Sequence, residues 1–117
     1  MQYLLLIYTN EKTDQDWTPE QREKDFGRYY AFTEKVKQLG VYLGGEALQP
    51  TRTATSVRVK NGKMLTTDGP FAETKEQLGG FYLLDCKDLD QALQLAAEIP
   101  ASEYGTIEVR PVMKFDM

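Results

Sequence analysis

Hydrophobic residues follow two different spacings along the chain, and these spacings predict strands that alternate with helices. Residues 2–9 and 78–86 are apolar at successive positions, which is typical of strands covered on both faces. Residues 106–112 alternate apolar with charged side chains, as expected of a strand with one covered face. In 19–39 and 89–99 apolar residues recur every three or four positions, which predicts two amphipathic helices.

Local signals mark the ends of these helices. Thr18 offers an N-cap hydroxyl, Pro19 suits the first helical position, and Gln21 stands where a capping box needs a side-chain amide. Gly40 is placed to end the first helix, because glycine readily adopts the left-handed conformation found just past a helix. Asp88 is the predicted N-cap of the second helix.

The middle of the chain is rich in turn signals. Residues 41–48 suggest a strand interrupted by two glycines. Asn61 and Gly62 form the pair best suited to the positive φ angles of a type I′ turn, so residues 57–66 are predicted to form a hairpin. An Asp-Gly-Pro sequence then predicts a loop over residues 68–78.

The predicted order is strand, helix, strand, hairpin, strand, helix, strand. This is the split βαβ pattern of a ferredoxin-like α+β domain with an inserted β-hairpin, and we predict one domain over residues 1–117. Right-handed crossovers place both helices on one face of the antiparallel sheet. Because 2–9 and 78–86 are apolar on the other face too, we expect a second copy of the chain to cover it in a homodimer.

Composition excludes several kinds of partner. Fourteen basic and eighteen acidic residues give a net charge of −4, which predicts neither a nucleic-acid partner nor a membrane surface. The single cysteine, Cys86, excludes an intrachain disulfide and is expected to be a buried, inert thiol. The apolar stretch 3–8 lacks the basic flank and the length of a signal peptide, so we expect a cytoplasmic protein.

The chain has no histidine and only two serines, so it cannot build a Ser-His-Asp or Cys-His nucleophile or a histidine-ligated metal site. The glycine pairs at 44–45 and 79–80 lack the spacing of phosphate-binding loops and are interpreted as bulges or places where backbones approach closely. We predict neither a cofactor nor a metal.

Several motifs resemble the DGPF-type members of the YCII-related family: Val57-Arg58, TDGPFAETKE at 67–76, Gly79-Gly80-Phe81 and GTIEVRP at 105–111. The resemblance covers nearly the whole chain and implies a dimeric α+β barrel in which two sheets face each other. It also implies a link to extracytoplasmic-function sigma factors, beside which such proteins tend to occur. Some relatives are proposed to use a His-Asp pair, which this chain cannot match.

The loop after the hairpin carries the first candidate site, formed by Asp68, Glu73, Lys75 and Glu76. Loops held by a rigid sheet often display functional residues. Asp68 is the predicted catalytic group, acting as a hydrogen-bond acceptor or, once desolvated, as a general base. In the competing interpretation, Asp68 accepts backbone N–H bonds in its own turn and the other charges are solvated.

Arg58, Glu108 and Arg110 form the second candidate site. They alternate with the apolar residues of 57–59 and 107–109, which are expected to face the helices, so the charged side chains should point into the space between two sheets. An arginine there could bind a carboxylate or phosphate through two hydrogen bonds. Alternatively, Arg58 and Glu108 form an ordinary cross-strand pair.

Aromatic side chains on the strands could line the same space, although such residues ordinarily belong to the core; they are Tyr3, Tyr8, Phe81 and Tyr82. Two hypotheses follow. The first is a binding or accessory protein whose homodimer takes a small polar or anionic molecule between its sheets and takes part in sigma-factor regulation. The second is a small cofactor-free isomerase, lyase or monooxygenase that uses Asp68 and an arginine.

Overall fold

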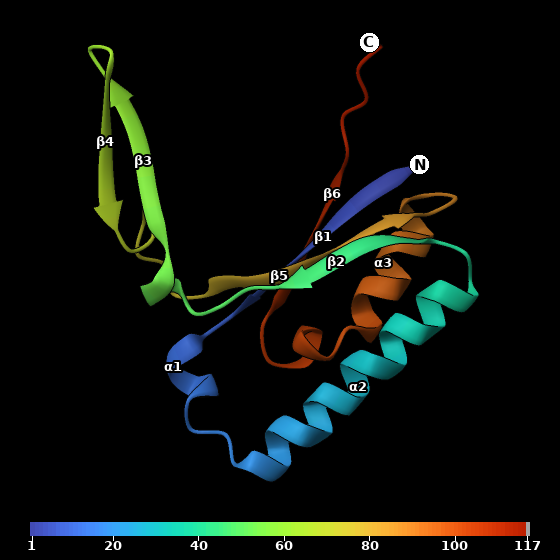
Figure 1. The fold of residues 1–117 in the computed structure, drawn as a ribbon. Helices are drawn as coiled ribbons and strands as arrows, with labels where there is room; N and C mark the ends of the chain where they lie inside the picture. Colours follow the sequence, from blue (N-terminus) through green and yellow to red (C-terminus); the bar gives the residue numbers. More distant parts are fainter. Residues whose placement is uncertain (117) are drawn as a thin grey trace.

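The computed structural model describes residues 1–116 and contains a four-stranded antiparallel sheet in the order β2-β5-β1-β6. Two helices cover one face of this sheet (Figure 1). This arrangement confirms the predicted ferredoxin-like α+β fold. The main elements are β1 (Gln2–Thr9), α2 (Pro19–Gln38), β2 (Tyr42–Ala47), β5 (Gln77–Asp85), α3 (Leu89–Glu98) and β6 (Thr106–Pro111). The shorter elements are α1 (Glu11–Asp14), η1 (Thr51–Thr53), β3 (Thr55–Lys60), β4 (Lys63–Asp68) and η2 (Pro100–Glu103).

The predicted helix ends are confirmed. The Gln21 backbone N–H donates to the Thr18 hydroxyl at 3.1 Å, and the Thr18 backbone N–H donates to the Gln21 side chain at 2.8 Å, which completes the capping box. Gly40 follows the helix with a φ of +75°. Asp88 accepts a hydrogen bond from the Gln91 backbone at the start of α3.

Side-chain alternation along β1 and β5 separates a buried face from an uncovered one. Leu5 and Leu84 are fully buried between the sheet and the helices. Their neighbours on the opposite side are only half-buried, since the helices lie on one side alone (Figure 1). We call this uncovered set the open face; it consists of Leu4, Leu6, Phe81 and Leu83.

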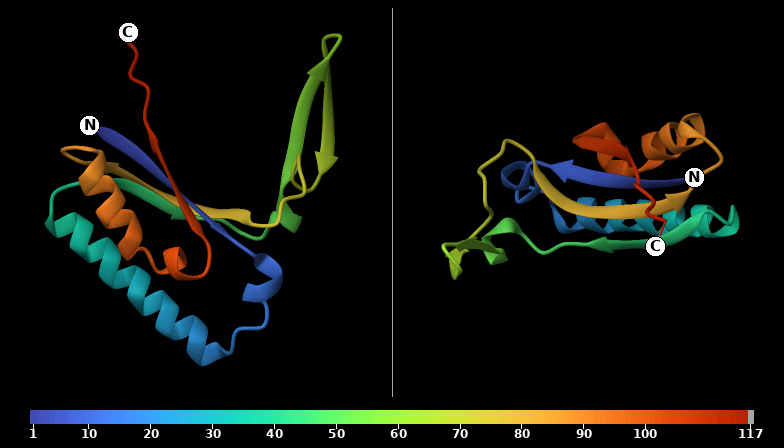
Figure 2. Two further views of the ribbon diagram at one scale, coloured as in Figure 1. Left: turned by 180° about the vertical axis from the view of Figure 1, so that it is seen from behind. Right: turned by 90° about the horizontal axis from the view of Figure 1, so that it is seen from above.

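The hairpin forms as predicted, but it leaves the sheet. Asn61 and Gly62 have φ angles of 53° and 77°, as a type I′ turn requires. β3 pairs with β4 in a separate two-stranded sheet that stands away from the body of the molecule (Figures 1 and 2). The expectation that Val57 and Val59 face the helices is therefore wrong: they are 58% and 71% exposed.

Two features of the helices differ from what the apolar spacing alone predicts. The spacing in 19–39 places Phe26 on the same helix face as Tyr29 and Val36, yet Phe26 is 74% exposed, because only the C-terminal half of α2 packs on the core, through Phe32 and Val36. The polar stretch 10–17 also contains the short helix α1, which begins where the Asn10 side chain accepts a hydrogen bond from the backbone of Lys12.

Candidate functional site

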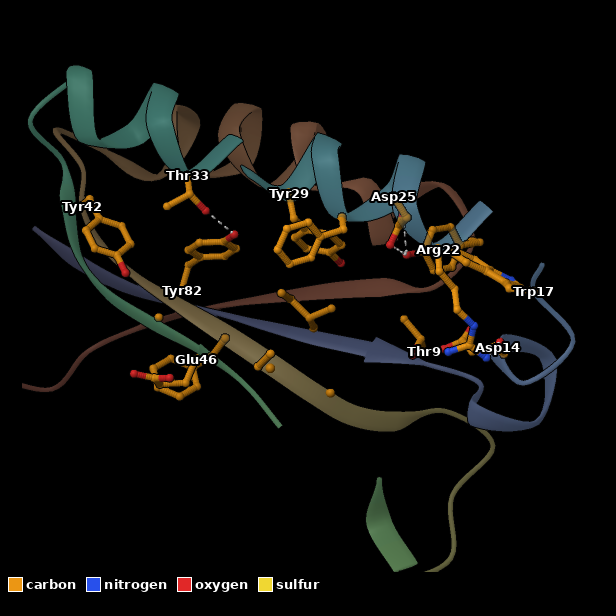
Figure 3. A pocket seen from close by; sticks show the side chains of 18 residues that line it. Thr9, Asp14, Trp17, Arg22, Asp25, Tyr29, Thr33, Tyr42, Glu46 and Tyr82 are labelled. Carbon is orange, nitrogen blue, oxygen red and sulfur yellow. Dashed lines mark hydrogen bonds between the residues drawn. The ribbon is translucent and has the colours of Figure 1, made fainter. Parts of the chain in front are cut away.

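A cleft of about 570 Å³ lies between α2 and the strands β2 and β5 (Figure 3). Its walls are mostly aromatic, with Trp17, Phe26, Tyr29, Tyr42, Tyr82 and Tyr104 among the lining residues. Thr9, Asp14, Arg22, Asp25 and Thr33 add polar groups. An apolar hollow with a few convergent polar side chains is the usual form of a small-molecule site.

Glycines form the floor of the cleft, where β2 and β5 run close together. A Cβ on Gly45 would lie 2.9 Å from the carbonyl oxygen of Phe81, and one on Gly80 would lie 2.8 Å from that of Glu46. Any side chain at either position would collide with backbone. The interpretation of the two glycine pairs as sites of close backbone approach is thus confirmed for these two residues, and the cavity above them stays open.

The helical wall is a ladder of side chains on one face of α2. Asp25, Tyr29 and Thr33 are four residues apart, so all three point from the helix toward the sheet (Figure 3). The hydroxyls of Thr33 and Tyr82 lie 2.8 Å apart across the cleft. Burial raises the pKa of Tyr82, and the Phe32 ring packs edge-on against it with 5.0 Å between centroids.

The polar end of the cleft is built around Tyr104. Its hydroxyl donates to the Asp25 carboxylate, with oxygen distances of 3.1 and 3.2 Å, and the Trp17 ring packs edge-on against the Tyr104 ring. An Arg28–Glu103 ion pair holds η2, and with it Tyr104, beside α2. These contacts join residues that are far apart in the sequence.

Burial is the main cause of the altered pKa values of Asp25, Tyr29 and Tyr104 at this end of the cleft. It raises the pKa of Asp25, and the hydrogen bond from Tyr104 opposes that rise. Burial also raises the pKa of Tyr29 to about 12. The pKa of Tyr104 is raised by burial first and then by the neighbouring Tyr29 and Asp25. At neutral pH both phenols keep their protons; the Tyr104 proton is already donated to Asp25, so its hydroxyl oxygen can only accept from a ligand, whereas the Tyr29 hydroxyl can donate.

The N-terminal edge of the cleft is bridged by Asp14, whose carboxylate accepts from the Thr9 hydroxyl at 2.8 Å. Arg22 donates to the backbone carbonyl of Asp14 at 3.1 Å. Glu46 also borders the cleft but points to the opposite side of the sheet from the ladder on α2 (Figure 3). Acidic groups therefore outnumber the single arginine, which disfavours an anion in this cleft.

Of the residues that the sequence suggested for a site, Phe81 and Tyr82 border this cleft. Asp68 lies opposite Thr55 at the base of the hairpin and is exposed, so the desolvation that its role as general base required is missing. Glu73 and Lys75 are exposed on the following loop. The loop charges and the cleft are separate features.

The second predicted site is divided between two parts of the molecule. Glu108 and Arg110 form an ion pair with each other on β6, next to Leu6 and Leu4 of the open face. Arg58 lies on the hairpin, opposite Leu65. The cross-strand pair of Arg58 with Glu108 is therefore wrong, because their strands belong to different sheets.

Sequence reasoning missed Trp17, Asp25 and Tyr104 as site residues. One signal was present: Asp25 stands four residues before Tyr29, so a carboxylate occupies the helix face that the apolar spacing assigned to the core. Tyr104 had no such signal, because its partner Asp25 is 79 positions away.

Among residues 1–116, the His, Cys, Asp and Glu side chains form no group of three arranged to hold a metal ion. The helices in that part of the chain are all too short or too polar to cross a membrane.

The strand order, the paired crossover helices and the cleft beneath α2 define a ferredoxin-like α+β domain with a hollow suited to small molecules. A family model, the YCII-related domain, matches residues 1–116, and the chain belongs to that family. It is 39% identical over 114 residues to the uncharacterized protein R00369 of Rhizobium meliloti (strain 1021), a match that covers 96% of this chain and 92% of that protein. The predicted membership of the YCII-related family is thus confirmed.

Proposed function

We propose that this protein binds a small molecule with an apolar, ring-containing body in the cleft between α2 and the sheet. The observation that carries the proposal is the cavity of about 570 Å³, lined by seven aromatic residues and reached by few polar side chains. Stacking against tyrosine and tryptophan rings favours a flat apolar ligand. The phenol of Tyr29 would donate a hydrogen bond, and the Asp25 carboxylate or the Tyr104 hydroxyl oxygen would accept one.

This location differs from the space between two sheets that the sequence suggested, and so does the charge of the ligand. With Asp14 and Asp25 facing a single arginine, a neutral or cationic ring should bind better than an anionic one. An anion site between the sheets of a dimer stays a prediction. Arg110 would have to exchange its present partner Glu108 for the ligand there.

The single tryptophan, Trp17, provides a direct test because it lines the cleft. Titration with 2-naphthol and with 2-naphthoate, which share a ring system and differ in charge, should change Trp17 fluorescence. We expect 2-naphthol to bind at least tenfold more tightly. Equal affinity, or tighter binding of the carboxylate, would contradict the charge argument.

A pair of variants on α2 tests the location. Tyr29→Ala removes a ring from the cleft wall and should weaken 2-naphthol binding at least tenfold. Tyr30→Ala removes a neighbouring ring that is 64% exposed and lies outside the cleft, so its affinity should stay within twofold of the parent. Equal losses in both variants would place the ligand elsewhere.

The second candidate function is a cofactor-free enzyme, and the hydrogen bond between Tyr104 and Asp25 favours it. In a proton-transfer reaction Asp25 would accept a proton from a bound carbon acid, and Tyr104 would stabilise the carboxylate. These two residues replace Asp68 and an arginine in that role. Asp25→Asn should then keep ligand affinity and abolish turnover, whereas a binding protein has no turnover to lose.

The homodimer and the link to sigma-factor regulation complete the proposal. The open face supports the dimer, because its four half-buried apolar side chains lie together on the side of the sheet away from the helices. The regulatory link rests on the resemblance to DGPF-type proteins alone. A ligand-sensing accessory protein would suit such a link, and ligand-dependent binding to a purified sigma factor would test it.

A further inference from the structure

The β3–β4 hairpin is an unusual element for a small domain because nothing else in the described chain supports its strands. β3 and β4 pair only with each other, and every residue of β4 is exposed. An isolated two-stranded ribbon is marginally stable in water and ordinarily needs a further strand or a packed surface. In Figures 1 and 2 it projects well beyond the sheet.

Further hydrogen bonds close the base of the hairpin and tie the preceding segment to α1. The Gly69 backbone N–H donates to the carbonyl of Ala54 at 2.7 Å, and the Ser56 hydroxyl donates to the carbonyl of Gly69 at 2.9 Å. Just before the hairpin, the Glu11 carboxylate accepts from the backbone N–H and the hydroxyl of Thr51. The first two bonds extend the pairing of the hairpin strands to their base, and the bonds of Thr51 tie the segment before the hairpin to α1.

The two sides of the ribbon differ in chemistry. Residues directly opposite each other in an antiparallel ladder share a side. Val57 is paired with Thr66 and Val59 with Met64, which gives one apolar side. The other side has Arg58 opposite Leu65 and Lys60 opposite Lys63. On the apolar side Val59 and Met64 are each 71% exposed, so the single chain leaves a hydrophobic stripe in water.

The whole chain also has too much surface for a monomer of its size. Its accessible surface is 8779 Å², whereas a compact monomer of 13.4 kDa exposes about 6,500 Å². Its radius of gyration is 16.3 Å, against about 13 Å for a compact chain of this length. The excess of about 2,300 Å² is comparable to one side of a large homodimer interface, about 1,000–2,500 Å² per partner.

We propose that the β3–β4 hairpin is an arm that packs its apolar side, Val57, Val59 and Met64, against a second copy of this chain. This surface is separate from the cleft and does not depend on ligand binding. The hairpin rises on the same side of the sheet as the open face, opposite the helices (Figure 1). A copy that covers the open face therefore lies within reach of the arm, and two-fold symmetry makes the contact reciprocal.

The distribution of charge between the hairpin and the rest of the chain also favours a second copy of this chain as the partner. The hairpin, residues 55–68, has three basic residues against one acidic residue, a net charge of +2. Since the whole chain carries −4, the rest of it carries −6. The arm of one copy is thus attracted to the body of another, while two arms repel each other.

Neighbouring substitutions on β4 test the proposal. Met64→Lys places a charge on the apolar side of the arm, and Leu65→Lys places the same charge one residue along, on the basic side. In sedimentation experiments we expect Met64→Lys to raise the dimer dissociation constant at least 30-fold and Leu65→Lys to change it less than threefold. Circular dichroism spectra identical to those of the parent would show that both variants fold.

Spin labelling gives a second readout that does not depend on a disruptive change. The only native cysteine is buried, so a nitroxide can be attached selectively at Val59→Cys or, as control, at Lys60→Cys. In the dimer the label at 59 should be immobilised and the label at 60 mobile. A parent chain that stays monomeric at 100 µM, equal effects of the two lysine variants, or equally mobile labels would each overturn the proposal.

Discussion

At the level of single residues, burial in the aromatic cleft raises the pKa of two phenols, Tyr29 and Tyr104, and of one carboxyl group, Asp25. Tyr29 lies behind Tyr104 and Asp25, and the removal of its hydroxyl from water accounts for most of its altered ionisation. Such groups make stability depend on pH, because the folded and unfolded chains bind protons differently.

Tyr29 predicts a loss of stability in alkali. Its pKa is raised from about 10 in the unfolded chain to about 12 in the fold. Its contribution is therefore fully present below about pH 10 and is lost as the pH rises through about 12. Between these pH values the unfolding free energy of the parent should fall more than that of Tyr29→Phe, which has no phenol to ionise at this position. Because the side chain is partly exposed, we expect this difference to be about 1–2 kcal/mol.

Urea denaturation at pH 7, 10 and 11.5 would measure this difference. Tyr30→Phe is the matched control, because its side chain is largely exposed on the same helix. If the parent and Tyr29→Phe lose stability in parallel above pH 10, the buried phenol is not responsible.

At the level of elements, sequence patterns predicted what depends on neighbours in the chain. The cap at Thr18, the turn at Asn61-Gly62 and the alternation of β6 are all local, and the structure contains each of them. Alternation also determines which residues share one side of the hairpin. It cannot determine whether that side meets the core, because this depends on the angle at which the ribbon leaves the sheet.

The candidate site could not be predicted from the sequence, because it also depends on contacts between residues far apart in the chain. Its hydrogen bonds join Asp25 to Tyr104 and Thr33 to Tyr82, pairs separated by 79 and 49 positions. A lone aspartate inside an amphipathic helix has no local partner that would identify it. Of the cleft residues, the sequence indicates only Phe81 and Tyr82, and it places Tyr82 between two sheets, whereas the Tyr82 ring packs in the core on the helical side.

The glycine floor gives a prediction at this level. Gly80→Ala would bring a Cβ to 2.8 Å from the Glu46 carbonyl, so β2 must shift away from β5. We expect a loss of about 1–3 kcal/mol in unfolding free energy, the range for overpacked sites. At Gly79 the nearest atom to a new Cβ is 3.9 Å away, so Gly79→Ala should cost much less in the same denaturation experiment. Equal costs would contradict the close approach of the two strands.

At the level of the whole molecule, the flat and extended shape, 48 × 47 × 19 Å, is consistent with the proposed homodimer. If folding and dimerisation are coupled, thermal stability must depend on protein concentration. A tenfold increase in concentration should raise Tm by about 3 °C in scanning calorimetry. A Tm that stays constant from 5 to 500 µM would indicate that each chain is stable alone.

The floor of the cleft and its helical wall differ in how they tolerate substitution. Because a Cβ on Gly45 or Gly80 would meet backbone, substitution at these two positions cannot narrow the cavity without separating β2 from β5. The opposite wall, the ladder of Asp25, Tyr29 and Thr33, belongs to a helix whose caps are formed by other residues and whose buried side chains are Phe32 and Val36. If the proposed ligand occupies the cleft, these three positions of α2 are the place to redesign its selectivity, because changes there leave both caps and the two buried side chains unaltered.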